Sequence, residues 1–266
     1  MYFWNKTRAL KIIAMIPARY ESKRLPGKLM MDLGGIPVIL STLNNTIKTN
    51  LFEKVYVVTD SKVIYDFLKP LHNDILFSKK EHFSGSDRIA EFAKDLDVDV
   101  IVNVQGDEPL VDEKSLNKLI NIFLNDSDKE VDLCSLMEEI NDEKTLNDPN
   151  SVKVITDSND FALYFSRNPI PYNRSKESIK YYKHIGVYGF RKNALIEFYN
   201  SSPTRLEMIE QLEQLRYLEK GKKIKMVQTD FKTIGIDTMD DLLKARKLFE
   251  WSKLEDSFFI KFLIGK

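Results

Sequence analysis

A loop rich in basic side chains carries the clearest sign of chemistry in this sequence. The loop follows the apolar run 12–16, which is typical of a buried strand. It holds four cations and a glycine, which are Arg19, Lys23, Arg24, Gly27 and Lys28. In open α/β sheets, ligands gather where strands end and helix N-termini offer free N–H groups. The loop therefore favours a polyphosphate site, with a solvated basic loop as the alternative.

The loop matches neither of the two common phosphate-binding motifs. No G-x-G-x-x-G follows a strand, and Leu29 stands after Gly27-Lys28 where a Walker loop has Ser or Thr. The predicted site therefore depends on side-chain cations more than on glycine backbone.

Two acids are candidate metal ligands. Asp107 follows the apolar run 100–104 and so should lie at the carboxyl edge of the sheet, beside the basic loop. A carboxylate that faces a triphosphate needs a cation between them, and oxygen ligands favour magnesium. Asp237 lies between the last predicted strand and its helix. A capped surface turn is the alternative for Asp107, and a helix N-cap is the alternative for Asp237.

Three further segments could contact a base or a sugar. Ser84 and Gly85 precede a predicted helix, where free backbone groups can read the edge of a base; an ordinary capping turn is the alternative. His184 and Tyr188 share the same parity on a strand and so point to one face. Arg167 closes another strand-like run. Together these three side chains could form a pocket for an acidic sugar, although a lone histidine is more often structural.

Composition indicates a globular enzyme without a nucleic-acid partner. The 266 residues are 43% hydrophobic and 30% charged, with 40 basic and 40 acidic side chains. Nucleic-acid-binding domains usually show a basic excess, which is absent here. The single cysteine, Cys134, excludes an intrachain disulfide, and its apolar neighbours predict an inert buried thiol. No signal peptide or membrane span is recognised, so we expect a cytoplasmic protein with no membrane contact.

Alternating strand and helix patterns must position these residues. In the first half we predict strands at 11–16, 54–59, 74–77 and 98–104, and helices at 37–48, 61–68, 86–96 and 113–124. In the second half we predict strands at 131–137, 152–156, 162–166, 185–190 and 224–229, and helices at 195–200, 206–219 and 239–249. The first half is typical of a mostly parallel sheet with helices on both faces. We expect the middle strands to form a smaller, subsidiary sheet.

Seven segments, in order, resemble the cytidylyltransferases that activate 3-deoxy-D-manno-octulosonate (Kdo). They are IPARYESKRLPGK, HFSGSDRIAE, VNVQGDEP, ALYFSR, KHIGVYGFR, LEMIEQLEQLR and GIDTMDDL. The resemblance runs from about Lys11 to about Arg246. The chain departs from the family at Ser86-Asp87, where relatives often have Thr then Glu, and near Thr204-Arg205, where two residues are added. Residues 1–10 and 251–266 extend past the typical ends.

The resemblance implies a glycosyltransferase-A-like α/β fold and a complete reaction. The enzyme would be a homodimer. With Mg²⁺, it would convert CTP and Kdo into CMP-Kdo and pyrophosphate for lipopolysaccharide biosynthesis. The family's residues for CTP phosphates match Arg19, Arg24 and Lys28, and those for base and ribose match Ser84, Gly85 and Gln105. Its magnesium ligands match Asp107 and Asp237. Its sugar-acid pocket matches Arg167, His184, Tyr188, Glu213 and Gln214.

The same resemblance divides one domain, 1–266, into two parts. A nucleotide-binding part would span about 11–130 and 224–250, and a sugar-binding and dimerisation lobe about 131–223. Three alternatives remain. The substrate could be a related keto-acid sugar, such as 8-amino-Kdo or a sialic acid. A sugar-1-phosphate nucleotidyltransferase should open with G-G-x-G-T-R, which is absent. A catalytically silent nucleotide-binding subunit should lack some of the acids and loop cations that this chain retains.

Overall fold

The described strands all belong to one mixed sheet. The computed structural model describes residues 9–22, 24–80, 82, 84–230 and 234–249, so both terminal extensions lie mostly outside it. The strands are β1 (Ile12–Ala18), β2 (Val55–Thr59), β3 (Ile75–Phe77), β4 (Val100–Asn103), β5 (Leu133–Ile140), β6 (Lys153–Thr156), β7 (Ala162–Ser166), β8 (Tyr181–Arg191) and β9 (Ile224–Gln228). Their main order is β3-β2-β1-β4-β8-β5-β9, with β6 and β7 branching from β8.

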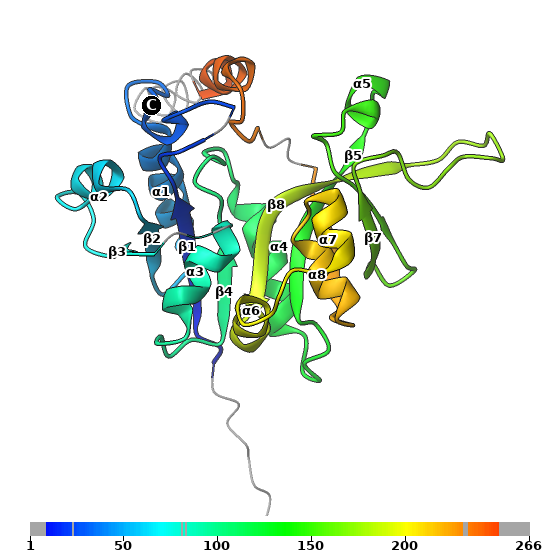
Figure 1. Ribbon diagram of the computed structural model, residues 1–266, viewed down its shortest axis with the longest axis horizontal. Helices are drawn as coiled ribbons and strands as arrows, with labels where there is room; N and C mark the ends of the chain where they lie inside the picture. Colours follow the sequence, from blue (N-terminus) through cyan, green and yellow to red (C-terminus); the bar gives the residue numbers. More distant parts are fainter. Residues whose placement is uncertain (1–8, 23, 81, 83, 231–233, 250–266) are drawn as a thin grey trace, which may run out of the picture.

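The first four strands run parallel and form the half of the sheet that was expected to bind the nucleotide. Every residue of β1 and β2 is buried, as expected for parallel strands covered on both faces. One face packs against α1 (Val38–Lys48), α2 (Lys62–Leu68) and α4 (Glu113–Leu124). The other packs against α3 (Gly85–Ala93), α6 (Lys192–Tyr199) and α8 (Gln214–Glu219). Figure 1 shows these layers, with α3, α6 and α8 on the viewer's side. The predicted α/β class is confirmed.

The expected subsidiary sheet is wrong, because β8 joins the two halves of the chain directly. β8 pairs antiparallel with β4 through Val102 and Gly189, and with β5 through Glu138 and Lys183. β9 then returns parallel to β5. The long β8 strand can reach both neighbours, so the middle strands extend the main sheet. In Figure 1 the hairpin that leads into β8 projects from the body as an arm.

The single helix predicted at 206–219 is also wrong. The chain forms α7 (Arg205–Glu210) and then α8, separated by Gln211 in the left-handed conformation with φ of 55°. The backbone N–H of Gln211 donates to the carbonyl of Glu207 and ends the first helix. Leu212 and Leu215 still pack into the core, and the break places Glu213 at the start of α8. A further short helix, α5 (Glu143–Asn147), begins at Asp142 and was not predicted.

Cys134 lies on β5, between β8 and β9, and is fully buried. Its Sγ donates to the carbonyl of Leu119, at 3.6 Å. Burial raises the pKa of the thiol, so the predicted inert cysteine is confirmed. In the described part of the chain, no helix is long and apolar enough to cross a bilayer.

Gly189 is required by the close packing of β8 on its neighbours. A Cβ there would lie 2.6 Å from Phe123 Cε2 and 2.9 Å from Cys134 Sγ. We therefore expect Gly189→Ala to lower the free energy of unfolding by about 1–3 kcal/mol, as other overpacked cores do. Chemical denaturation measures this. In Gly186→Ala the new Cβ would meet Gln105 at an ordinary 3.7 Å, so this control should stay within about 0.5 kcal/mol of the parent. Equal stability of both variants would contradict the packing argument.

Candidate active site

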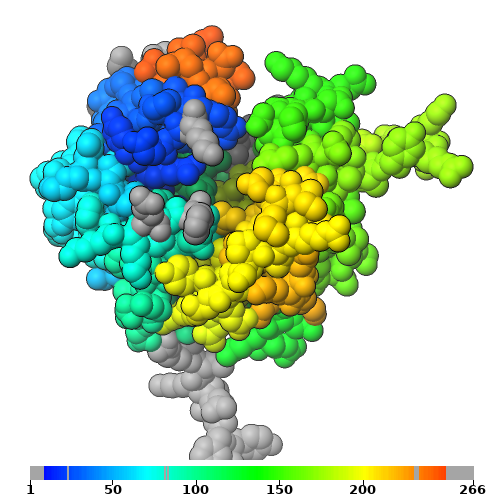
Figure 2. Space-filling view, viewed as in Figure 1, coloured from blue at the N-terminus to red at the C-terminus, as the bar shows by residue number. Residues whose placement is uncertain are grey.

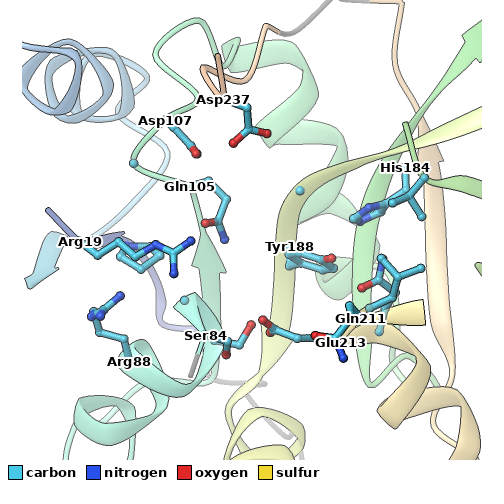
Figure 3. Close-up of a pocket in the computed structure, with 18 of the residues that line it drawn as sticks. Arg19, Ser84, Arg88, Gln105, Asp107, His184, Tyr188, Gln211, Glu213 and Asp237 are labelled. Carbon is cyan, nitrogen blue, oxygen red and sulfur yellow. The ribbon is translucent and has the colours of Figure 1, made fainter. Parts of the chain in front are cut away.

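A cavity of about 360 Å³ opens where β1, β4 and β8 meet. Figure 2 shows the hollow between the basic-loop half of the molecule and the α7–α8 segment. Most of the predicted site residues line it, namely Arg19, Lys28, Ser84, Gly85, Gln105, Asp107, His184, Tyr188, Glu213, Gln214 and Asp237. The structure therefore brings together side chains that are far apart in the sequence. In Figure 3 the labelled members point from opposite walls into one space.

Lys28 joins the basic loop to both candidate metal ligands. Its Nζ forms ion pairs with Asp107 and, at 3.0 Å, with Asp237. Gly27, with φ of 69°, turns the chain so that Lys28 begins a short 3-10 helix and lies buried beneath the loop. Burial alone would lower the pKa of Lys28, but the charges and hydrogen bonds of the two carboxylates outweigh it and raise the pKa. The ammonium therefore stays charged between the two acids.

Arg24 lies outside the cavity lining but contributes charge at its edge. Its guanidinium pairs with Asp237 at 2.9 Å, so Asp237 contacts two cations. The side chain of Asp237 is not the N-cap of the following helix. In the helix at 239–249, the hydroxyl of Thr238 accepts from the backbone N–H of Asp241, at 3.3 Å. The carboxylate of Asp237 is thus available to a cation.

Asp107 and Asp237 have the geometry to share one divalent cation. A single ammonium already pairs with both, so their oxygens converge on one point. The described residues contain no group of three or more His, Cys, Asp or Glu side chains that could hold a metal alone. Magnesium is commonly bound by one or two carboxylates, with the remaining ligands from substrate phosphates and water. The donor set present here fits that pattern.

Glu108 follows Asp107 directly in the chain, and no role was predicted for it from the sequence. It is buried against Gly235, where an added Cβ would lie 2.8 Å from Glu108 Oε1. Burial, and then the charge of Asp107, raise the pKa of Glu108 to about 8. Its carboxyl group is therefore mostly protonated at neutral pH. On this side of the cavity, Asp107 and Asp237 are the lining carboxylates.

The wall predicted for the base is tightly packed around Gly85. A Cβ at Gly85 would lie 3.1 Å from Pro17 Cγ and 3.4 Å from the Gln105 amide. Ser84 caps α3 by accepting from the N–H of Asp87, which supports the capping interpretation of this turn. Arg88, one turn further on, also lines the cavity and pairs with Asp60. No function was predicted for Arg88 from the sequence.

The wall predicted for the sugar combines aromatic rings with a half-buried acid, Glu213. The centroid of the His184 ring lies 5.1 Å from the ring centroid of Tyr188 and 5.4 Å from that of Phe165. Burial lowers the pKa of His184 to about 3, so its imidazole is neutral at neutral pH. Burial raises the pKa of Glu213, although hydrogen bonds from Ser86 and Ser84 oppose this. This wall therefore carries a neutral imidazole and a carboxyl group whose pKa is raised.

Arg167 does not line the cavity in this structure. Its guanidinium donates to three backbone carbonyls: Glu210 at 2.7 Å, Pro149 at 2.8 Å and Gln211 at 3.3 Å. It therefore holds the turn between α7 and α8, and Gln211 of that turn lines the cavity. Its predicted contact with a sugar remains a prediction.

Comparisons with known proteins show the family of this chain. The family model described as Cytidylyltransferase matches residues 13–224. The chain belongs to this cytidylyltransferase family. It is 54% identical over 239 residues to a protein of Christiangramia forsetii named 3-deoxy-manno-octulosonate cytidylyltransferase, covering 90% of this chain and 96% of the relative. A protein of the same name from Flavobacterium johnsoniae is 54% identical over 240 residues, covering 90% and 98%.

A solved structure shares the whole cytidylyltransferase architecture. It is a CMP:2-keto-3-deoxy-manno-octonic acid synthetase complexed with CTP, with a TM-score of 0.85 and 32% identity. The match covers 91% of this chain and 99% of that one. The resemblance noted in the sequence is thereby confirmed for the family and its fold.

The buried, neutral imidazole predicts a pH-dependent stability. Between its ordinary pKa of 6.5 and the folded value of about 3, the unfolded chain binds a proton on His184 that the native state does not. Stability of the parent should therefore fall with pH from about 6.5 downward, by up to about 1.4 kcal/mol per unit. His184→Gln removes this contribution. The unfolding free energy of the parent minus that of the variant should fall by about 2 kcal/mol between neutral pH and about pH 5. Urea titrations that give a constant difference would contradict the assignment.

Proposed function

We propose that this protein transfers CMP from CTP to the anomeric hydroxyl of Kdo, which gives CMP-Kdo and pyrophosphate for lipopolysaccharide biosynthesis. The observation that carries the proposal is the cavity itself. A cationic loop and a carboxylate pair form one wall, and a wall of aromatic and polar side chains faces them. The two relatives at 54% identity, both named 3-deoxy-manno-octulosonate cytidylyltransferase, support the choice of sugar.

The basic residues of the site bind and screen the triphosphate. A hydroxyl that attacks the α-phosphorus must approach negatively charged oxygens, so fixed cations lower the barrier by neutralising them. Arg19, Arg24 and Lys28 stabilise the departing pyrophosphate. Ser84, Gly85 and Gln105 hold the base and ribose, and a side chain at position 85 would crowd Pro17 and Gln105 on this wall. The two substrates are thus held in line for displacement.

Asp107 and Asp237 hold the magnesium ion that we propose for this reaction. A magnesium ion held there would polarise the phosphate and lower the pKa of the attacking hydroxyl. Lys28 contacts both acids, so it keeps them together and adds a positive charge beside the phosphates. Glu108 is mostly protonated and does not add a third negative charge to this pair.

The opposite wall positions the sugar acid. We assign His184, Tyr188, Glu213 and Gln214 to it, and Arg167 supports the α7–α8 turn beside them through its contacts with backbone carbonyls. A neutral His184 with a pKa of about 3 is a poor base at neutral pH, so its part is binding and orientation. A related keto-acid sugar, such as 8-amino-Kdo or a sialic acid, is the alternative substrate. Pyrophosphate release with CTP and a panel of these sugars tests the choice, and the highest kcat/KM with Kdo is expected.

A homodimer is proposed from the exposed apolar groups at and near the arm. Tyr172, Ile179 and Leu163 are exposed, and Tyr172 is 88% exposed. These residues lie on the hairpin before β8 and on β7. A second copy of the chain covering them would place the dimer contact in the sugar-side part. Light scattering measures the oligomeric state. We also propose a cytoplasmic location, because the reaction uses CTP.

Asp107→Asn removes one of the two charges proposed to hold magnesium, with little change in packing. We expect kcat to fall on the order of 100-fold or more at saturating magnesium. Pyrophosphate release measures the loss, and thermal unfolding should confirm that the variant is folded. Asp240→Asn is a matched control, because it removes an exposed carboxylate from the neighbouring helix. Activity of Asp107→Asn within about tenfold of the parent would remove this residue from the metal site.

Lys28→Ala should weaken the use of CTP far more than the use of the sugar. Charged hydrogen bonds contribute enough that the KM for CTP should rise roughly 10- to 100-fold. Because the sugar wall is formed by other elements, the KM for the sugar should change by less than about threefold. Lys62→Ala, which breaks an exposed ion pair with Asp66, serves as the control for a lost lysine. An equal rise in both KM values, or a rise for the sugar alone, contradicts the assignment.

A further inference from the structure

The hydroxyl of Ser135 lies against His184 at an irregularity between β5 and β8. The register of the two strands shifts between Ser135 and Leu136, so the backbone of β8 is displaced there. Ser135 is fully buried, and its Oγ has three hydrogen-bonding neighbours. These are Val187 O at 2.9 Å, Ile185 O at 3.1 Å and His184 Nε2 at 3.0 Å.

A serine hydroxyl has one proton, and this fixes the direction of the three contacts. Both carbonyl oxygens can only accept, so the proton of Ser135 must point to one of them. If the proton pointed to His184 instead, the hydroxyl oxygen would face two carbonyl oxygens at 2.9 and 3.1 Å with no proton between. The carbonyl that takes this proton would then lose its donor, which is costly. The hydroxyl of Ser135 therefore accepts from His184, and Nε2 carries the ring proton.

We propose that Ser135 is a positioning residue that fixes His184 in its Nε2–H tautomer and so presents an unprotonated Nδ1 to the cavity as an acceptor for a sugar hydroxyl. The inference deepens the proposed function, on which it rests for the identity of the sugar. Nδ1 has no hydrogen-bond partner among the residues that the structure describes. Figure 3 shows the imidazole of His184 directed into the cavity beside Tyr188.

The surroundings of the imidazole keep Nδ1 of His184 unprotonated. The rings of Phe165 and Tyr188 enclose it, and burial lowers the pKa of His184 to about 3. A neutral nitrogen lone pair attracts O–H and N–H donors and repels carboxylate and phosphate oxygens. His184 therefore selects a hydroxyl of the sugar acid, and the carboxylate of the sugar must lie on other groups.

The tautomer can be measured on the parent protein without substrate. The chain has three histidines, so histidine-selective ¹⁵N labelling gives a simple long-range ¹H–¹⁵N correlation spectrum. A His184→Gln variant assigns the signals. At neutral pH we expect a protonated Nε2 and an unprotonated Nδ1 on His184. A protonated Nδ1, or a charged ring, would overturn the proposal, and this holds even if no Ser135 variant folds.

The functional part of the proposal is tested with Ser135→Ala. Loss of the fixed tautomer should raise the KM for the sugar roughly three- to tenfold, with the KM for CTP within about twofold of the parent. The spectrum should show His184 in mixed tautomers. Ser135→Thr retains a hydroxyl and should retain the tautomer and most of the sugar affinity. If Ser135→Ala keeps both the tautomer and the sugar KM of the parent, Ser135 does not position His184.

A matched control separates this effect from general loss of a buried hydroxyl. Ser115 is also buried, and its Oγ lies 2.7 Å from Thr229 Oγ1, outside the cavity lining. Ser115→Ala should lower stability without changing the sugar KM or the His184 spectrum. If the parent shows no turnover with CTP and any keto-acid sugar, the proposed function fails. The tautomer would still be read from the spectrum, so the two failures are distinguishable.

Discussion

The ion cluster of Lys28, Asp107 and Asp237 is the interaction on which the rest of the site depends. Its members come from the loop after β1, the end of β4 and the segment before the helix at 239–249. Removal of one member would leave a partly buried charge without its partner, which is strongly unfavourable. The backbone reinforces the cluster, because the N–H of Ile236 donates to the carbonyl of Asp107 at 2.9 Å. Three distant segments are thereby held at one edge of the sheet.

The second constraint is the position of β8 between β4 and β5. β8 pairs with β4 through Tyr188, opposite Asn103, and with β5 through His184, opposite Met137, so it places both side chains near the end of the strand that Asp107 follows. One rigid sheet thus carries both walls of the cavity, without a linker between them. A site that brings two reactants together benefits from such rigidity, since a displacement of about 1 Å can be costly.

Much of the fold and the grouping of the site could be predicted, because both depend on local signals. Buried strands read as apolar runs, and polar residues that follow parallel strands must meet at one edge, as Asp107 and the basic loop do. The rest depends on long-range packing. Gln211 breaks a helix that its sequence period favours, Glu108 is buried as a neutral acid, and Arg167 is bound to distant carbonyls. Ser135 gave no signal, since its role comes from a register shift between strands.

The burial of Cys134 has a practical consequence for experiments on this molecule. It is the single cysteine of the chain, and its thiol is fully enclosed with a raised pKa, so it reacts slowly with alkylating reagents while the protein is folded. A new cysteine on the projecting arm would then be the one fast-reacting thiol. Fluorophores or spin labels could be attached there without replacing Cys134. The natural sequence is thus already suited to distance measurements between the arm and the cavity.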